Sequence, residues 1–195
     1  MNGDNADLIA RIGERESYSD KAARAFFGES VKTLVCGSKR KCLEAALTGE
    51  AGGAFVPVHN VIIGDVKEGG KTVKEMADEL GLRLISEYRL RVRLVLASLG
   101  TLEEIAMVYS IGPALDQCTD FFDKHKHLTR ASTIDNKEIT DTSTAAKHVK
   151  NIDVKYAAAI CDADAAKLHD VPVIKTLVAN KEPNFTTFFL YRKQL

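Results

Sequence analysis

Hydrophobic positions recur along the chain at two spacings, one of about 3.6 residues, typical of helices, and one of two residues, typical of strands. Two stretches with the helical spacing are followed by a glycine, Gly49 and Gly81, which is suited to end a helix. The helical spacing predicts helices over residues 19–27, 39–48, 71–80, 113–124, 143–149 and 163–169.

Short runs of β-branched and other apolar residues separate these helices. The alternation of strands and helices is typical of mixed α/β domains with right-handed crossovers and open sheets. The pattern starts again after two consecutive strands, so we expect the chain to cross there from one lobe to another. The predicted strands cover residues 31–36, 53–58, 83–88, 91–97, 106–110, 128–133, 156–161, 173–178 and 186–191.

Composition indicates a compact domain that binds a small molecule. Of the 195 residues, 45% are hydrophobic and 28% are charged, which is ordinary for a globular protein. Lysine plus arginine and aspartate plus glutamate both number 27, so no net field attracts nucleic acid or anionic membranes. No apolar run is long enough to span a bilayer, and Met1 to Asp4 lack the pattern of a secretory signal. We therefore expect a cytoplasmic location.

The potential metal ligands and reactive thiols have no convincing pattern. Cys36, Cys42, Cys118 and Cys161 form no Cys-x-x-Cys pair, which favours reduced structural thiols. His125 and His127 lie in a polar stretch without a suitably spaced carboxylate or cysteine, and we expect them at the surface. No Walker-type or dinucleotide-binding motif is present, so neither a metal nor a cofactor is predicted.

Serine and threonine residues gather where predicted strands lead into helices. Ser17, Ser19, Ser110 and residues 142–144 all lie at such junctions. Backbone N–H groups at helix starts bind anions, so these positions suit a carboxylate ligand. The alternative is helix capping, which stabilises a helix by roughly 1 kcal/mol without any ligand.

Five segments together resemble the catalytic domain of the prephenate dehydratase family. Residues 181–188 resemble its Asn-x-Thr-Arg-Phe signature, and residues 56–64 resemble Val-Pro-Ile-Glu-Asn-Ser-x-x-Gly. Residues 110–118 are similar to Ser-His-Pro-Gln-Ala-Leu-x-Gln-Cys. Residues 12–19 and 142–146 resemble the opening loop and a later Ser/Thr-rich helix start. The five segments follow the family's order and spacing.

Three positions depart from the family's motifs. His59 stands in place of glutamate, Val61 in place of serine and Thr187 in place of arginine. Prephenate is a dianion, and an arginine can clamp one of its carboxylates through two parallel hydrogen bonds, which a threonine cannot do. Arg15, in the first segment, is a candidate replacement, although a solvated loop arginine is the simpler interpretation.

The resemblance implies a two-lobed fold of the type II periplasmic-binding-protein kind, with the ligand in the cleft between the lobes. It places lobe 1 at about residues 1–88 and 179–195, and lobe 2 at about residues 89–178. It also implies a homodimer. The family commonly continues into an ACT domain that binds phenylalanine; because the chain ends at Leu195, we expect no such domain and no feedback inhibition by that route.

The resemblance also suggests roles for individual residues. Thr186 matches the threonine that protonates the departing C4 hydroxyl of prephenate. Imidazole titrates near pH 6.5, so His59 is a candidate donor of a proton to a ring carbon, or else a structural replacement for glutamate. The expected substrate contacts are Arg15, Ser17, Ser19, Asn60, Ser110, Thr142, Ser143, Asn184 and Phe188.

Three functions follow, and the sequence leaves them open. The first choice is a lyase that decarboxylates prephenate without forming an aromatic ring, as relatives in specialised pathways such as antibiotic biosynthesis do. Such relatives also depart from Thr-Arg-Phe, and some carry a histidine after Val-Pro. The second is a dehydratase that forms phenylpyruvate or acts on a modified prephenate. The third is a non-catalytic protein that binds a carboxylate ligand.

Overall fold

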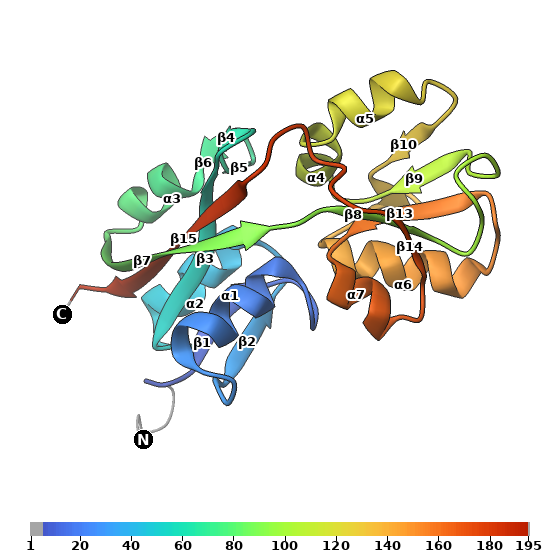
Figure 1. Cartoon of the computed structure of the whole chain (residues 1–195). Helices are drawn as coiled ribbons and strands as arrows, with labels where there is room; N and C mark the ends of the chain where they lie inside the picture. The colour runs from blue at the N-terminus through green and yellow to red at the C-terminus, as the bar shows by residue number, and fades with distance from the viewer. Residues whose placement is uncertain (1–5, 195) are drawn as a thin grey trace. The chain divides into compact units, whose positions relative to one another are not determined.

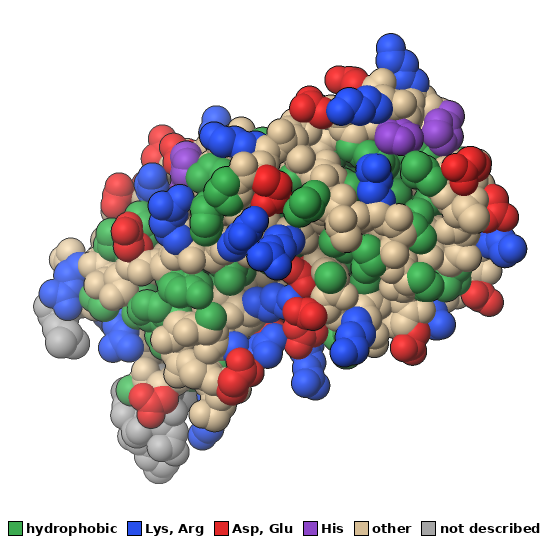
Figure 2. Space-filling model, in the orientation of Figure 1, with side chains coloured by type: hydrophobic (Ala, Val, Ile, Leu, Met, Phe, Trp, Pro, Cys, Tyr) green, Lys and Arg blue, Asp and Glu red, His purple; other side chains and the backbone are tan. Residues whose placement is uncertain are grey.

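The computed structural model describes residues 6–194 and divides into two compact units (Figure 1). Of the described residues, unit 1 comprises residues 6–13, Tyr18–Arg91 and residues 185–194, and unit 2 comprises Glu14–Ser17 and Val92–Asn184. Residues 1–5, which include the segment considered for a secretory signal, and residue 195 lie outside the described residues. They are also the two ends of predicted lobe 1. Within residues 6–194, no helix is long and apolar enough to cross a membrane. Figure 2 shows acidic and basic side chains interspersed on the visible face.

Unit 1 is a mixed sheet with helices against it. The strand order is β2-β1-β3-β15-β7, and β4 also pairs with β3. β1 runs parallel to β2 and β3, whereas β15 is antiparallel to β3. The strands are β1 (Ile9–Ile12), β2 (Thr33–Cys36), β3 (Gly53–Asn60), β4 (Gly64–Asp65), β7 (Leu82–Val92) and β15 (Asn184–Lys193), beside a hairpin of β5 (Lys67–Glu68) and β6 (Lys71–Thr72).

Local sequence sets the limits of the unit 1 helices α1 (Tyr18–Phe27), α2 (Lys39–Thr48) and α3 (Val73–Glu79). The Ser38 side chain accepts a hydrogen bond from the Lys41 N–H at the start of α2, and Gly49 ends that helix with a φ of 81°. This left-handed conformation has little cost for glycine. The α2 bounds confirm the prediction. Helix α3 begins two residues later than predicted, because Lys71–Thr72 form β6 and Thr72 caps the helix.

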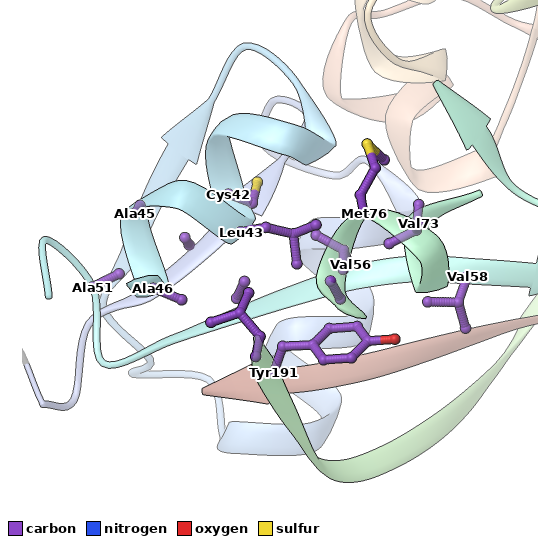
Figure 3. Packing of buried hydrophobic residues seen from close by; sticks show 14 residues of the cluster. Cys42, Leu43, Ala45, Ala46, Ala51, Val56, Val58, Val73, Met76 and Tyr191 are labelled. Carbon is purple, nitrogen blue, oxygen red and sulfur yellow. The ribbon is translucent and has the colours of Figure 1, made fainter. Parts of the chain in front are cut away.

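Two apolar clusters hold unit 1 together. In the first, Leu43 of α2, Met76 of α3 and Val56 of β3 are at most 2% exposed and pack with Tyr191 of β15 (Figure 3). The second cluster contains Phe55 and Phe188, whose rings stack with centroids 5.5 Å apart. Because Val56 and Phe55 are consecutive on β3 and belong to different clusters, both faces of the central strand are covered.

Unit 2 repeats the α/β plan with the strand order β10-β9-β13-β8-β14. Its central strand β13 is buried at all five positions, as the apolar run predicts. An apolar cluster that includes Val95, Val149 and Ala159 packs the sheet against α6 and α7. The elements are β8 (Val95–Ser98), β9 (Met107–Tyr109), β10 (Thr129–Ala131), β11 (Thr133–Ile134), β12 (Lys137–Glu138), β13 (Ala157–Cys161), β14 (Val173–Lys175), α4 (Gly112–Asp116), α5 (Thr119–Lys124), α6 (Thr142–Ile152) and α7 (Ala163–Leu168).

Further predicted elements differ from the structure. The strand predicted over 83–88 continues to Val92 in β7, and the strand predicted over 91–97 is divided between the end of β7 and β8, which begins at Val95. The strand predicted over 128–133 is divided between β10 and β11. The helix predicted over 113–124 is divided into α4 and α5, which are separated by Gln117 and Cys118. Strand β1 was not predicted, because its four residues include the charged Arg11.

All four cysteines are free in the structure, as predicted. Burial raises the pKa of the Cys118 thiol to about 12 and also raises that of Cys42. These thiols are therefore protonated near neutral pH and are poor nucleophiles.

Candidate functional site

Two adjacent residue pairs on β3 and β15 carry the predicted catalytic residues. Asn60 lies opposite Thr186, and His59 lies opposite Thr187, with an irregularity in register just after these pairs. Successive residues of a strand point to opposite faces of the sheet. The pair Asn60–Thr186 therefore lies on one face, and the pair His59–Thr187 lies on the other.

On the first face, Asn60 holds the Thr186 hydroxyl. The Asn60 side chain is 2% exposed, and its Nδ2 donates to Thr186 Oγ1 at 3.0 Å and to the Phe185 carbonyl at 3.1 Å. Its Oδ1 accepts from the backbone N–H of Ile62 at 2.9 Å, which fixes the orientation of the amide. Thr186 Oγ1 thus accepts a hydrogen bond, and among the hydrogen bonds of residues 6–194 its own proton has no acceptor.

On the second face, His59 belongs to a small exposed network. His59 Nδ1 lies 3.1 Å from Asp65 Oδ1 of β4, and Lys74 Nζ of α3 donates to the same oxygen at 3.4 Å. The hydrogen bond with His59 is the largest cause that holds the pKa of Asp65 below its usual value, followed by Lys74. Lys74 also lies over the ring of Phe189, two residues beyond Thr187. These contacts agree with the faces deduced from the strand pairing.

Phe188, predicted to contact substrate, is a core residue of unit 1. It is 1% exposed and its ring stacks on Phe55. Its place two residues after Thr186 puts it on the same face as that hydroxyl. The ring therefore supports the sheet beneath Thr186, and a direct contact with a ligand stays a prediction.

In unit 2, Asp141 organises the start of helix α6. Its Oδ1 accepts from the backbone N–H groups of Ser143 and Thr144, each at 2.9 Å. Its Oδ2 accepts from the Thr144 hydroxyl at 2.9 Å and from the Glu14 N–H at 3.1 Å. A carboxylate at a helix start is favourable, but it occupies donors that we predicted for an external anion. The residue that caps α6 is therefore Asp141 and not a serine or threonine.

The two predicted binding residues after Asp141 have different surroundings. Thr142 Oγ1 is buried and has no hydrogen-bond partner among the described residues. A buried hydroxyl without a partner is costly in the absence of a ligand or water. Ser143 is fully buried, and its Oγ lies 3.0 Å from His169 Nε2. Burial, and then the charge of Lys147, lower the pKa of His169, which favours a neutral ring.

Residues 14–17 form a turn that carries Arg15 and Ser17. The Ser17 N–H donates to the Glu14 carbonyl at 3.2 Å, and Glu14 is in turn tied to Asp141. Arg15 is exposed, whereas Ser17 is 2% exposed. The bond between Glu14 and Asp141 therefore brings the Arg15 segment to the start of α6, beside Thr142.

Ser19 and its neighbours connect α1 to β1 within unit 1. Ser19 is 6% exposed, and the next residue, Asp20, forms a buried ion pair with Arg11 at 2.7 Å. Arg11 also donates to the Gly13 carbonyl. This pair could not be predicted from the sequence, because a charged residue in a short strand is not recognised as buried before its partner is known.

The remaining predicted contacts have internal partners. Ser110 is fully buried and donates to the Ile160 carbonyl at 2.7 Å. Asn184 is also fully buried, and its amide donates to Gln117 Oε1 at 2.8 Å. Gln117 donates onward to Pro113. These side chains stabilise the packing of unit 2, and their contacts with a ligand stay predictions.

No group of histidine, cysteine, aspartate or glutamate residues among those described could hold a metal ion. His125 Nδ1 lies 2.8 Å from the Phe121 carbonyl, and His127 is exposed. The predicted site residues divide between the two units, and the cleft expected between the lobes stays a prediction.

Comparison with known proteins agrees with this architecture. The chain is 30% identical over 184 residues to a bifunctional chorismate mutase/prephenate dehydratase of Neisseria gonorrhoeae. The matched region covers 93% of this chain and 48% of the relative. The chain thus spans about half the length of that relative.

Solved structures identify the fold. A prephenate dehydratase from Arthrobacter aurescens, in complex with L-Phe, matches 96% of this chain and 61% of its own with a TM-score of 0.76 and 20% identity. The methionine-binding protein MetQ matches 96% of this chain and 82% of its own with a TM-score of 0.51 and 10% identity. The predicted periplasmic-binding-protein-like α/β fold is therefore confirmed.

The family model for prephenate dehydratase matches residues 9–194, which is nearly the whole described chain and includes all five segments singled out from the sequence. The chain belongs to the prephenate dehydratase family.

Proposed function

We propose that the protein is a lyase that converts prephenate to phenylpyruvate, carbon dioxide and water. The observation that carries this proposal is a chain of two hydrogen bonds: the Ile62 N–H donates to the Asn60 side chain, which in turn donates to Thr186 Oγ1. The Asn60 amide fixes the Thr186 oxygen and leaves the hydroxyl proton available for donation. Membership of the family supports prephenate as the substrate.

The reaction needs only one proton donor, placed at the C4 hydroxyl of prephenate. As the bond from the ring to the carboxylate breaks, its electron pair enters the ring and carbon dioxide departs. The C4–oxygen bond breaks at the other side of the ring, and the leaving oxygen takes the proton of Thr186 to become water. A proton from solvent then restores the Thr186 hydroxyl. The hydrogen bond from Asn60 stabilises negative charge that develops on Thr186 Oγ1, so a weak acid becomes usable in a fixed geometry.

In unit 2, the exposed Arg15 and the buried hydroxyl of Thr142 are the candidates for binding a carboxylate. The backbone donors at the start of α6 are taken by Asp141, whose charge opposes an anion there. A guanidinium beside that helix start offsets this charge and offers two parallel donors. Arg15 therefore is our candidate for the function of the arginine that Thr187 replaces.

Decarboxylation without aromatisation is the second candidate, and the substitutions at positions 59 and 187 favour it. It requires delivery of a proton to a ring carbon while the C4 hydroxyl stays in place. His59 is half-exposed and hydrogen-bonded to Asp65 on the sheet face opposite Thr186. A substrate in contact with Thr186 is therefore poorly placed to receive a proton from His59, and we rank dehydration first.

The identity of the product tests the proposal. Purified protein is incubated with prephenate, and the products are separated and identified by mass spectrometry, with a protein-free sample as the control for spontaneous conversion. We expect the mass of phenylpyruvate. A product that has lost carbon dioxide but kept the hydroxyl oxygen would favour the second candidate. Binding of prephenate without turnover would indicate a non-catalytic protein.

A further inference from the structure

A buried ion pair in unit 1 lies next to the turn that carries Arg15, and no step of the proposed reaction uses it. Arg11 of β1 is 5% exposed, and Asp20 in the first turn of α1 is 6% exposed. Arg11 Nη2 lies 2.7 Å from Asp20 Oδ1. Arg11 Nη1 donates to the Gly13 carbonyl at 2.5 Å and to the Ile12 carbonyl at 3.3 Å. One guanidinium therefore binds the end of β1 and the start of α1 at the same time.

The place of this pair along the chain connects it with the candidate site. Strand β1 and Gly13 come before residues 14–17, and helix α1 begins at Tyr18 directly after them. Arg11 binds the backbone where this short segment begins, and Asp20 lies in the first helical turn after it ends. The ion pair thus holds the two ends of segment 14–17 to each other.

The contacts of segment 14–17 itself indicate a single imposed conformation. The Ser17 N–H donates to the Glu14 carbonyl at 3.2 Å, and the Glu14 N–H donates to Asp141 Oδ2 at 3.1 Å. Glu16 has a φ of 62°, which is unfavourable for a residue other than glycine. Such a conformation persists only where the surrounding structure imposes it. The ends of the segment are where unit 1 can impose it.

Stability alone does not account for a buried ion pair at this place. The cost of taking two charges out of water can exceed the gain from their attraction, and well-packed apolar residues of similar volume often give equal or greater stability. An arginine has a use that an apolar residue lacks. Its planar group binds a carboxylate and backbone carbonyls in fixed directions, as Arg11 does here.

We propose that the Arg11–Asp20 pair is a positioning element for substrate binding: it fixes both ends of segment 14–17 and so directs the Arg15 guanidinium to a carboxylate of prephenate. The inference rests on the proposed function, in which Arg15 binds that carboxylate. Arg11 and Asp20 are buried, so they act through the segment and not by contact with the substrate. Their loss should weaken substrate binding more than it slows the chemical step.

Arg24 supplies a matched control. Its Nε lies 3.1 Å from Asp20 Oδ2, so it is a second guanidinium on the same carboxylate, one helical turn further along α1. Arg24→Gln removes a positive charge from Asp20 but keeps the hydrogen bonds that Arg11 donates to the backbone. Arg24 also leaves Asp20 with a charged partner when Arg11 is replaced, so we expect the Arg11 variants to fold.

Hydrogen–deuterium exchange of the full chain is the first measurement, because it reports on the segment without any substrate. Arg11→Lys keeps a positive charge beside Asp20 but loses the planar group that also binds the carbonyls. The hydrogen-bonded amides of Glu14 and Ser17 should exchange about tenfold faster in Arg11→Lys than in the parent, and at the parent rate in Arg24→Gln. Arg11→Met, an apolar replacement, should exchange at least as fast as Arg11→Lys. Thermal melting checks that each variant is folded.

Two results of the exchange measurement would overturn the proposal. One is the parent rate in folded Arg11→Lys, since the segment would then be held without the Arg11 guanidinium. The other is an equal gain in Arg24→Gln, because the cause would then be the charge around Asp20 and not the bonds to the backbone.

Steady-state kinetics with prephenate test the action through Arg15. Arg11→Lys should raise the KM by about five- to tenfold with a smaller change in kcat, and Arg24→Gln should leave both within about twofold. When Arg15 is already replaced by glutamine, Arg11→Lys should change the KM less than about twofold, because the group that it aligns is absent. An undiminished rise in that background would overturn the role through Arg15. A parent that does not turn prephenate over would refute the proposed function, whereas the exchange rates would still decide whether the pair holds the segment.

Discussion

Two neighbouring residue pairs of the β3–β15 ladder have opposite relations to the family. The pair Asn60–Thr186 keeps both family residues, whereas the pair His59–Thr187 has lost a glutamate and an arginine. The first pair is linked side chain to side chain at 3.0 Å. In the second, the ring of His59 turns to Asp65 of β4 instead of to the facing threonine.

The two departures occupy facing positions on adjacent strands. In a relative with the family motifs, glutamate and arginine would stand directly opposite each other on adjacent strands, where opposite charges stabilise the pairing. The two substitutions are therefore not independent of each other, and they lie on the face away from Thr186.

The strongest test of the comparison removes each threonine hydroxyl in turn. Thr186→Val should lower turnover of prephenate by about 10²- to 10⁴-fold, the range for loss of a general acid. Thr187→Val, one residue away on the other face, should lower it less than about threefold. Steady-state kinetics with prephenate measure the turnover of both variants and of the parent. Equal losses would mean that the two faces are not functionally distinct.

A second test removes the hydrogen bond to Thr186 but keeps the shape of the donor. Asn60→Asp replaces the donating amide by a carboxylate oxygen, which cannot donate to Thr186 Oγ1 and opposes negative charge there. We expect turnover to fall by about 10²-fold, as for loss of one donor to a developing oxyanion. Full activity in a variant with an unchanged melting temperature would remove the observation on which the proposed reaction rests.

The third test asks whether Arg15 supplies the guanidinium missing from position 187. Arg15→Gln should raise the KM for prephenate by roughly tenfold with a smaller change in kcat, because uniform binding is lost. Lys21→Gln, on α1, is a control for loss of one positive charge. If both variants keep the parent KM, the carboxylate is held by other groups.

A fourth test rebuilds the second pair. The double variant His59→Glu with Thr187→Arg should stabilise the protein by about 0.2–1 kcal/mol through a cross-strand ion pair. The ratio of dehydrated to hydroxyl-retaining product should stay as in the parent, since the pair lies opposite Thr186. A changed ratio would show that this face does influence the reaction and would return His59 to a catalytic role.

The sequence predicted elements well where the signal was local. Helix α2 was predicted at its observed bounds, and Gly49, which marks its end in the sequence, ends it in the structure. The faces of β3 and β15 could not be predicted in the same way. They depend on the pairing of positions 59 and 187, which lie far apart in the sequence, and on a local irregularity in register.

Candidate site residues show the same limit. The hydroxyl residues at helix starts were recognised, but Asp141, which takes the donors of α6, was not, although an aspartate just before a helix is a known capping signal. Asp65 and Gln117 were missed for another reason. Their partners, His59 and Asn184, are brought to them only by the tertiary fold.

The smallest predicted effect concerns pH and contrasts His169, which contacts a buried serine, with the exposed His127. Burial lowers the pKa of His169, which contacts Ser143, from the ordinary value of 6.5. The unfolded chain therefore binds a proton more readily than the folded one, so this contribution to stability is complete above about pH 6.5 and declines as the pH falls through that value. Burial lowers the pKa of His148 in the same direction.

His169→Gln should reduce the loss in melting temperature between about pH 7.5 and about pH 5.5 by on the order of 1 °C, whereas His127→Gln, at an exposed position, should not. Differential scanning calorimetry at the two pH values measures this. A parent whose melting temperature rises on acidification would contradict the assigned direction, and an equal effect of both variants would place the cause outside the contact between His169 and Ser143.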